Sequence, residues 1–366
     1  MGDTYFLTGY PGFLAGSLVK QLVHDHRETI DHIYMLALPN LLDQATEEIT
    51  NYARKHEIDP SIFTVIGGDI TKPDLAINAD ENRMLRDTVT HVFHLAAIYD
   101  LAVPKNIAYK VNVIGTQQVN HWVQTLQKLV RYIYFSTAYV SGTREGRIYE
   151  HELAEGQTFR NHYEHTKFEA ELLVDALKQS VPTTIIRPGV VKGDSKTGET
   201  IKFDGLYFML NYLDRIGFTP VLPYFGEGEP EGNFVPSDYI LKATSYLGLA
   251  PIGEGKTYHL TDPKPYTMRK LQKLLAEHYL GKSPKGKVPV SLIKAMMELK
   301  PIRKWFHVEK EVMDYFLIHS SYDCTQALTD LRGSGISCPD LKDTLPSMIN
   351  FYRKYKDDQR KQIQIR

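Results

Sequence analysis

The chain has 366 residues, of which 42% are hydrophobic and 24% are charged, and its formal net charge is −1. This length suits a cofactor domain with a smaller substrate lobe, and the composition excludes wholesale disorder. The near-neutral charge argues against nucleic acid as a partner, because proteins that bind phosphate backbones usually carry a basic excess.

In the first half of the chain, short apolar runs alternate with longer helical patterns. Strands are predicted at Thr4–Thr8, His32–Leu38, Phe63–Gly67, His91–Leu95, Arg131–Phe135 and Thr183–Arg187. Helices are predicted at Phe13–His26, Leu41–His56, Lys105–Leu129 and Asn161–Gln179. Strand, helix and strand at this spacing form right-handed βαβ units. The predicted fold class is α/β: a Rossmann doubly wound parallel sheet with a smaller, mostly helical C-terminal substrate lobe.

After Pro188 the chain becomes rich in glycine, proline and aromatic residues, and only one helix is predicted between residues 192 and 233, at Gly205–Ile216. A helix at Pro236–Leu249 and a strand at Lys256–Leu260 are predicted to return to the first domain. We therefore assign residues 1–191, with a return segment at about 234–261, to the Rossmann domain. The substrate lobe is assigned to residues 192–233 and 262–366.

A glycine-containing turn joins the first predicted strand to the first predicted helix in the segment TYFLTGYPGFLA, residues 4–15. Gly9 suits the tight turn, and Gly12 removes a side chain where the backbone must approach a pyrophosphate. Phe13 and Leu14 place free N–H groups at the open helix N-terminus, where the helix dipole favours phosphate. Because the pattern directly follows the first strand of a βαβ series, it indicates a dinucleotide site rather than an ordinary Gly-Pro turn.

Two further strand ends supply candidate contacts for this cofactor. Asp69 and Ile70 follow the third strand, where an acid and an apolar side chain can hold an adenine. The fourth strand ends in residues that let a cofactor pass over its carboxyl end: Leu95, Ala96 and Ala97. The second strand ends in MLALPN, without the acid that selects NAD, so NADP is favoured and NAD is the alternative.

Tyr163 and Lys167 are four residues apart in a predicted helix, so their side chains share one face. An ammonium near a phenol is expected to lower the pKa of the tyrosine, which makes it a usable general acid or base. Thr137 closes the fifth strand at the edge of the sheet where ligands bind. Its hydroxyl is expected to hold a substrate carbonyl oxygen beside Tyr163.

In this order, the motifs resemble the extended short-chain dehydrogenase/reductase family over about residues 1–260. The resemblance implies catalytic roles for Thr137, Tyr163 and Lys167, with Lys167 also holding the cofactor ribose. Asn112 matches a helix asparagine that supports a proton relay to the lysine in such enzymes. A solvated helix asparagine is the alternative interpretation of Asn112.

Within that family the chain is most similar to the thioester-reductase and fatty acyl-CoA reductase branch. The similar segments are STAYVSG at 136–142, IRPGVVKGDSKTG at 186–198 and NFVPSDY at 233–239. The second of these segments supplies four further candidate cofactor contacts: Pro188, Gly189, Val190 and Val191. The resemblance implies an NAD(P)H-dependent oxidoreductase that reduces an acyl thioester or another small-molecule carbonyl, with Tyr163 as proton donor.

Two other functions stand as alternatives to this one. Sugar-nucleotide epimerases and dehydratases, which use bound NAD, commonly carry Val-Tyr-Gly where this chain has Val140-Ser141-Gly142. A dinucleotide-binding sensor without turnover is the third hypothesis, and the intact Tyr163–Lys167 pair argues against it.

Partners and compartment are indicated only broadly. The segment Lys282–Phe306 mixes basic and apolar residues and most simply packs on the substrate lobe; a weak contact with membrane headgroups or an acyl-carrier protein is the alternative.

No metal is expected, because no histidine pair gathers further ligands. Cys324 and Cys338 are interpreted as reduced thiols, with a disulfide as the alternative. Without a signal peptide or an apolar run of roughly 18 residues, a soluble cytoplasmic protein is expected.

Overall fold

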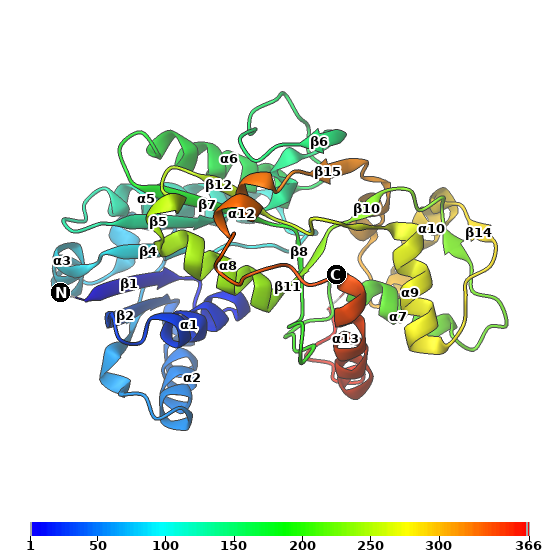
Figure 1. Ribbon diagram of the computed structural model, residues 1–366, viewed down its shortest axis with the longest axis horizontal. Coiled ribbons are helices and arrows are strands. Elements are labelled where there is room, and N and C mark those ends of the chain that lie inside the picture. The colour runs from blue at the N-terminus through cyan, green and yellow to red at the C-terminus, as the bar shows by residue number, and fades with distance from the viewer. Residues whose placement is uncertain (1, 364, 366) are drawn as a thin grey trace.

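A seven-stranded parallel sheet forms the centre of the larger part of the molecule (Figure 1). The computed structural model describes residues 2–363 and 365, and its strands follow the order β12-β7-β5-β4-β1-β2-β3. The strand bounds are β1 Asp3–Thr8, β2 Ile30–Ala37, β3 Phe63–Gly67, β4 His91–His94, β5 Arg131–Phe135, β7 Thr183–Pro188 and β12 Thr257–Leu260. The strands predicted for the first half are therefore confirmed with small shifts at their ends, and so is the returning strand.

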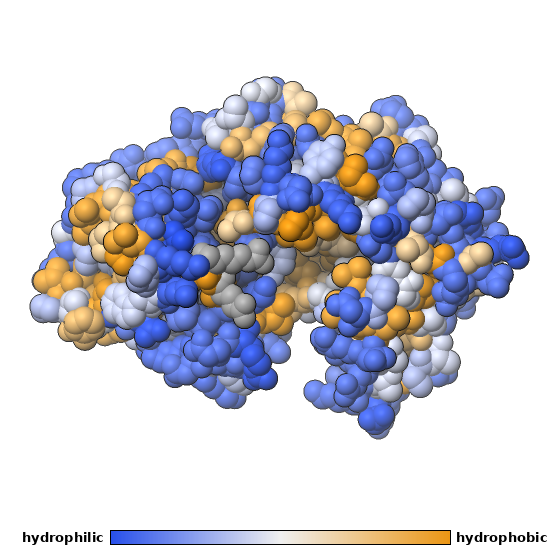
Figure 2. All heavy atoms as spheres, turned by 180° about the vertical axis from the view of Figure 1, so that it is seen from behind, coloured by the Kyte–Doolittle hydropathy of each residue, from blue (hydrophilic) through white to orange (hydrophobic). Residues whose placement is uncertain are grey.

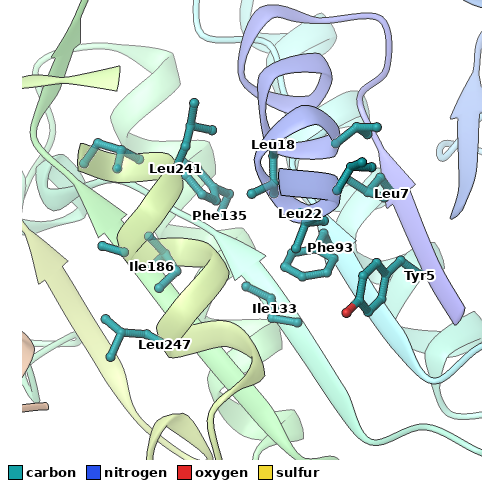
Figure 3. Close-up of a cluster of buried hydrophobic side chains, with 14 of the residues drawn as sticks. Tyr5, Leu7, Leu18, Leu22, Phe93, Ile133, Phe135, Ile186, Leu241 and Leu247 are labelled. Carbon is teal, nitrogen blue, oxygen red and sulfur yellow. The ribbon is translucent and has the colours of Figure 1, made fainter. Parts of the chain in front are cut away.

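Helices cover both faces of this sheet, as a doubly wound fold requires. One face carries α1 Phe13–His26, α2 Leu42–Lys55, α8 Ser237–Leu249 and the short α12 Thr325–Asp330. The other face carries α3 Ala79–Thr88, α5 Gly115–Val123 and α6 His162–Leu177. Figure 3 shows the first face, where Leu18 and Leu22 of α1 and Leu247 of α8 pack over Phe93 and Ile133 of the sheet.

One predicted helix differs from the structure, and one helix of the structure was not predicted. The helix expected at Lys105–Leu129 is α4 Lys105–Ala108, a π-helix at Tyr109–Ile114 and α5, which ends at Val123. The helix α3 was not predicted, because its sequence ADENRMLRDT buries only Asn82 and Leu85 and so lacks an apolar stripe. Its start is instead fixed by Asn78, whose side chain accepts a hydrogen bond from the N–H of Glu81 at 2.9 Å.

The smaller lobe is built around an apolar core of its own. Its helices are α7 Tyr207–Ile216, α9 Met268–Leu280, α10 Val290–Met297, α11 Lys300–Phe306 and α13 Leu341–Tyr355, with a 3-10 helix η7 at Lys310–Leu317. Short strand pairs join its loops: β8 Val190–Lys192 with β11 Phe234–Pro236, β9 Tyr224–Phe225 with β14 Lys287–Val288, and β10 Glu231–Gly232 with β13 Tyr266–Thr267. A fourth pair, β6 Gly146–Ile148 with β15 Ser320–Tyr322, joins a loop after β5 to the late chain.

The carboxyl ends of the sheet strands point toward the smaller lobe (Figure 1). The space-filling view shows the molecule hollowed between the two parts (Figure 2). Within the described residues, no helix is both long and apolar enough to cross a bilayer. The candidate site lies where the strand ends meet the small lobe.

Candidate active site

The predicted phosphate loop connects β1 to α1 at the centre of the sheet. Gly9 has a φ of +90°, and a Cβ on it would lie 2.8 Å from the backbone nitrogen of Ala96. A Cβ on Gly12 would lie 2.6 Å from the carbonyl oxygen of Gly9. Both positions therefore exclude a side chain, as the glycine pattern predicted.

The loop leaves the start of α1 open to a ligand. Gly12, the N-cap residue, is exposed and no side chain caps the helix, while Phe13 and Leu14 are half-buried at its first turn. Leu95, Ala96 and Ala97, also half-buried, follow β4 next to this loop. A cradle that admits no Cβ, beside an uncapped helix N-terminus, fits the pyrophosphate of a dinucleotide.

Replacing Gly12 by aspartate is expected to weaken NADPH binding by roughly 100-fold or more, which corresponds to about 2.7 kcal/mol. The added side chain would clash with the loop, and its charge would repel phosphate at the helix N-terminus. Fluorescence titration with NADPH measures the effect. Gly156→Asp is the control, because it adds the same side chain at a strained backbone position, with a φ of +75° and nothing within 4 Å of a Cβ; equal affinities in the two variants would contradict this assignment of the loop.

The residues predicted for the adenine end differ in their surroundings. Asp69 is half-buried, and its carboxylate accepts a hydrogen bond from the N–H of Thr71 at 2.8 Å. Ile70 is buried in the core cluster on the α5 face and packs against Gly115. Asp69 therefore borders the accessible strand ends, whereas Ile70 contributes mainly to the floor beneath them.

Asn112 is buried rather than solvated, so its alternative interpretation as a solvent-exposed residue is wrong. Its side chain accepts a hydrogen bond from the N–H of Ile98 at 2.9 Å and donates to the carbonyl of Ile98 at 3.0 Å. It also donates to Thr166 of α6 at 3.0 Å. Asn112 thereby joins the loop after β4 to the helix that carries Tyr163 and Lys167.

Thr137, Tyr163 and Lys167 come together at the end of β5. Thr137 is buried and hydrogen-bonds with Tyr163, which lies in the first turn of α6. The Lys167 ammonium donates to the carbonyl of Phe135 at 2.7 Å and to the hydroxyl of Tyr134 at 2.9 Å. The three predicted side chains therefore share one corner of the sheet edge.

The pKa of Tyr163 is raised, whereas the sequence predicted that it would be lowered. Burial raises the pKa of Tyr163 to about 12, and the hydrogen bond from Thr137 offsets this only in part. Burial also lowers the pKa of Lys167 to about 7, against the attraction of Glu171. The expected lowering by the ammonium is not seen, because Lys167 is bonded to Tyr134 and Phe135 instead, and burial sets the direction for both groups.

The four residues at the end of β7 border the small lobe. Pro188 and Gly189 are buried, and a Cβ on Gly189 would lie 2.5 Å from the side-chain oxygen of Asn233. Val190 and Val191 are half-buried and start β8, which pairs in parallel with β11. At this strand pair the chain leaves the central sheet and enters the small lobe.

A buried ion pair beneath the site was not predicted. Arg187 of β7 donates to Glu171 of α6 at 2.6 and 2.8 Å, and both side chains are at most 2% exposed. Ser136, one residue before Thr137, donates to the other carboxylate oxygen of Glu171. The pair fixes β5, β7 and α6 relative to one another, and only tertiary structure brings its members together.

A second unpredicted group joins the small lobe to the first turn of α6. The Tyr315 hydroxyl, from η7, donates to Glu164 at 2.8 Å and accepts from Asn161 at 3.0 Å. Glu164 is fully buried next to Tyr163, and its other oxygen accepts from the N–H of Arg160 at 3.1 Å. The spacing of Asn161 and Glu164 is close to a capping box and was the one sequence signal for this cluster.

Tyr315→Phe is expected to destabilise the protein by about 1–3 kcal/mol, because it removes a donor from a buried carboxyl. Urea unfolding measures the loss. The control is Tyr266→Phe, which removes a bond of the same kind, from Tyr266 to Asp340 at 2.8 Å, at an exposed position. A loss no larger than that of the control would show that Tyr315 does not hold the first turn of α6.

Comparison with known proteins agrees with this geometry. The NAD-binding family model described as male sterility protein matches residues 7–244. Fatty acyl-CoA reductase wat of Drosophila melanogaster is 26% identical over 272 residues, which cover 65% of this chain and 52% of that protein. The non-canonical nonribosomal peptide synthetase cpsA of Aspergillus campestris is 24% identical over 273 residues, 70% of this chain and 25% of that protein. The chain thus spans about half or less of these relatives.

Solved structures share the fold over nearly the whole chain. The terminal R domain from the myxalamid PKS-NRPS biosynthetic pathway aligns with a TM-score of 0.77 at 23% identity, covering 97% of this chain and 91% of that one. UDP-glucuronic acid 4-epimerase from Bacillus cereus, in complex with NAD, aligns with a TM-score of 0.64 at 21% identity, covering 96% and 99%.

The parallel sheet, the glycine loop at its centre and these matches define an NAD(P)-binding domain of the extended short-chain dehydrogenase/reductase type. Within that class, the chain belongs to the male sterility protein family. The resemblance inferred from the motifs is thereby confirmed.

Proposed function

We propose that this protein is an NADPH-dependent reductase of acyl thioesters, with Tyr163 as the proton donor. The observation that carries the proposal is the grouping of Thr137, Tyr163 and Lys167 at the end of β5, two strands along the sheet from β1 and its glycine loop. The relatives named for fatty acyl-CoA reduction support the thioester as substrate. NADP is preferred over NAD because no acid stands at the end of β2, where the chain reads Ala37-Leu38-Pro39.

In this proposal the substrate carbonyl oxygen binds between the hydroxyls of Thr137 and Tyr163. The bound nicotinamide supplies a hydride to the carbonyl carbon. Tyr163 gives its phenolic proton to the oxygen, which is negatively charged once the hydride has added. The resulting hemithioacetal then releases the thiol and leaves an aldehyde. Lys167 and Asn112 hold this corner in place, and Lys167 has the further proposed role of binding the ribose.

The test is the consumption of NADPH and of NADH by the purified protein with acyl-CoAs of varied chain length, with aldehydes and with ketones. Consumption with an acyl-CoA, accompanied by one equivalent of free thiol, is the expected result. Activity on a ketone but on no thioester would remove the thioester assignment and leave a reductase of other carbonyls.

A sugar-nucleotide epimerase is the second candidate, because an NAD-bound epimerase shares the fold over 96% of this chain. Such an enzyme returns the hydride to its substrate, so its cofactor is retained and not consumed. Protein that purifies with tightly bound NAD and converts UDP-sugars without net oxidation would favour this candidate over the reductase.

A further inference from the structure

Two adjacent loops form the outer end of the small lobe, and we call them the tip loops: residues 217–223 after α7 and residues 281–287 after α9. The side chain of Lys282 donates to the carbonyls of Gly217 at 2.7 Å and Thr219 at 3.1 Å. The N–H of Lys285 donates to the carbonyl of Leu222 at 2.8 Å. Strands β9 and β14 then pair directly behind the loops. The two loops are therefore one built unit, at the right-hand end of Figure 1.

The tip loops hold large apolar side chains in water. Phe218 is 81% exposed and Val221 is 54% exposed. The next residue, Leu222, is buried in the core of the small lobe and anchors the loop. Leu292 and Met296, one turn apart on the following helix α10, are 52% and 42% exposed. Hydrophobic residues gather at this end of the lobe, at the left of Figure 2. Such a protruding apolar group is a candidate contact surface, because exposed phenylalanine is otherwise unfavourable.

The charge along this part of the chain is mainly basic, and the carboxylates at the tip loops are already engaged: Glu277 accepts a hydrogen bond from Ser283 and pairs with Lys273. Residues 281–304 contain seven basic residues and a single acid, Glu298, in a chain whose net charge is −1. The first tip loop, GFTPVLP, contains no charged residue, and the second, GKSPKGK, contains three lysines and no acid. Lys287 pairs with Glu227, but in the part of the chain that the structure describes no carboxylate pairs with Lys285. The apolar tip is therefore flanked by a local positive charge.

We infer that the tip loops dock on an anionic phospholipid surface, with Phe218 and Val221 in the headgroup region and the exposed Lys285 on the lipid phosphates. A convex apolar tip with flanking lysines matches a bilayer interface, where apolar burial and attraction to anionic lipid add together. A second copy of the chain would bring the same positive charge to the contact and repel it. The inference does not depend on the proposed function, since it concerns an end of the lobe outside the candidate site.

Vesicle sedimentation tests the inference, with vesicles of phosphatidylcholine alone and of an equimolar mixture with phosphatidylglycerol. The protein is expected to sediment with the mixed vesicles and to remain in solution with the neutral ones. Val221→Ser and Phe218→Ser should each weaken partitioning, by about tenfold for phenylalanine, and Lys285→Glu by about fivefold or more. In a Trp305→Phe background, Phe218→Trp should show a blue-shifted emission with the mixed vesicles only.

Matched substitutions far from the tip serve as controls. Val130→Ser replaces a valine that is 51% exposed in the loop before β5, and Lys110→Glu reverses a charge that is exposed on the π-helix. Neither should change partitioning. Sedimentation that the tip variants leave unchanged, or equal binding to poly-glutamate without any need for Phe218, would overturn the inference. A concentration-dependent dimer that Phe218→Ser abolishes would instead assign the tip to a second copy.

Discussion

Tyr163→Phe is expected to lower kcat for thioester reduction by about 100-fold or more, while NADPH binding stays within about threefold of the unsubstituted protein. The phenol is the proton donor of the proposed reaction, and the ring that remains still fills the same space beside Thr137. Because burial raises the pKa of Tyr163 to about 12, the phenol is protonated at neutral pH, which is the state that a donor needs. Stopped-flow rates at saturating substrate measure the loss.

Two further substitutions make this result specific. Tyr246→Phe, on α8 and 37% exposed, should leave kcat unchanged. Lys167→Met should raise the KM for NADPH as well as lower kcat, since the proposed mechanism assigns Lys167 to the ribose. A Tyr163→Phe protein that keeps more than a tenth of the activity would mean that another group, or water, supplies the proton.

Glu171→Ala is expected to lower the free energy of unfolding by about 3–5 kcal/mol. The substitution leaves the guanidinium of Arg187 charged and buried, since both side chains of the pair are at most 2% exposed. It also removes the acceptor of the Ser136 hydroxyl. A loss of this size is a large part of the stability of a typical domain, so urea unfolding should show it clearly.

The double replacement of Glu171 by leucine and Arg187 by methionine should recover most of that loss, because the guanidinium of Arg187 is then no longer left buried without its partner. The exposed pair of Lys287 with Glu227, whose side chains are 57% and 64% exposed, provides the comparison. Glu227→Ala should cost less than about 1 kcal/mol. Equal costs for Glu171→Ala and Glu227→Ala would show that burial does not set the energy of the first pair.

The sheet was predictable because its strands are buried on both faces and therefore appear as nearly continuous apolar runs. The phosphate loop was predictable because its glycines are required by local backbone geometry at Gly9 and Gly12. The polar helix α3 gave no such periodic signal. The lobe boundaries and the roles of the site residues stay predictions, since they depend on a bound substrate and cofactor.

Contacts between distant segments were beyond sequence reasoning. Nothing in the chain before folding connects Tyr315 with Glu164 or Arg187 with Glu171, because each pair depends on how two lobes or two elements pack. The direction of the pKa shift of Tyr163 was wrong for a related reason. The spacing of Tyr163 and Lys167 indicates that they share a helix face, but not how much solvent either one loses or which neighbours hold the ammonium.

The π-helix at Tyr109–Ile114 has a consequence for the rest of its helical segment. A π turn holds one more residue than an α turn, and each residue of an α-helix rotates the chain by about 100°. That one additional residue sets the direction in which the side chains of α5 point. It thereby turns Val119 and Trp122 toward the sheet. At the same place it leaves Asn112 facing Ile98 and Thr166. The number of residues in this turn therefore helps to align the floor of the site with the core beneath it.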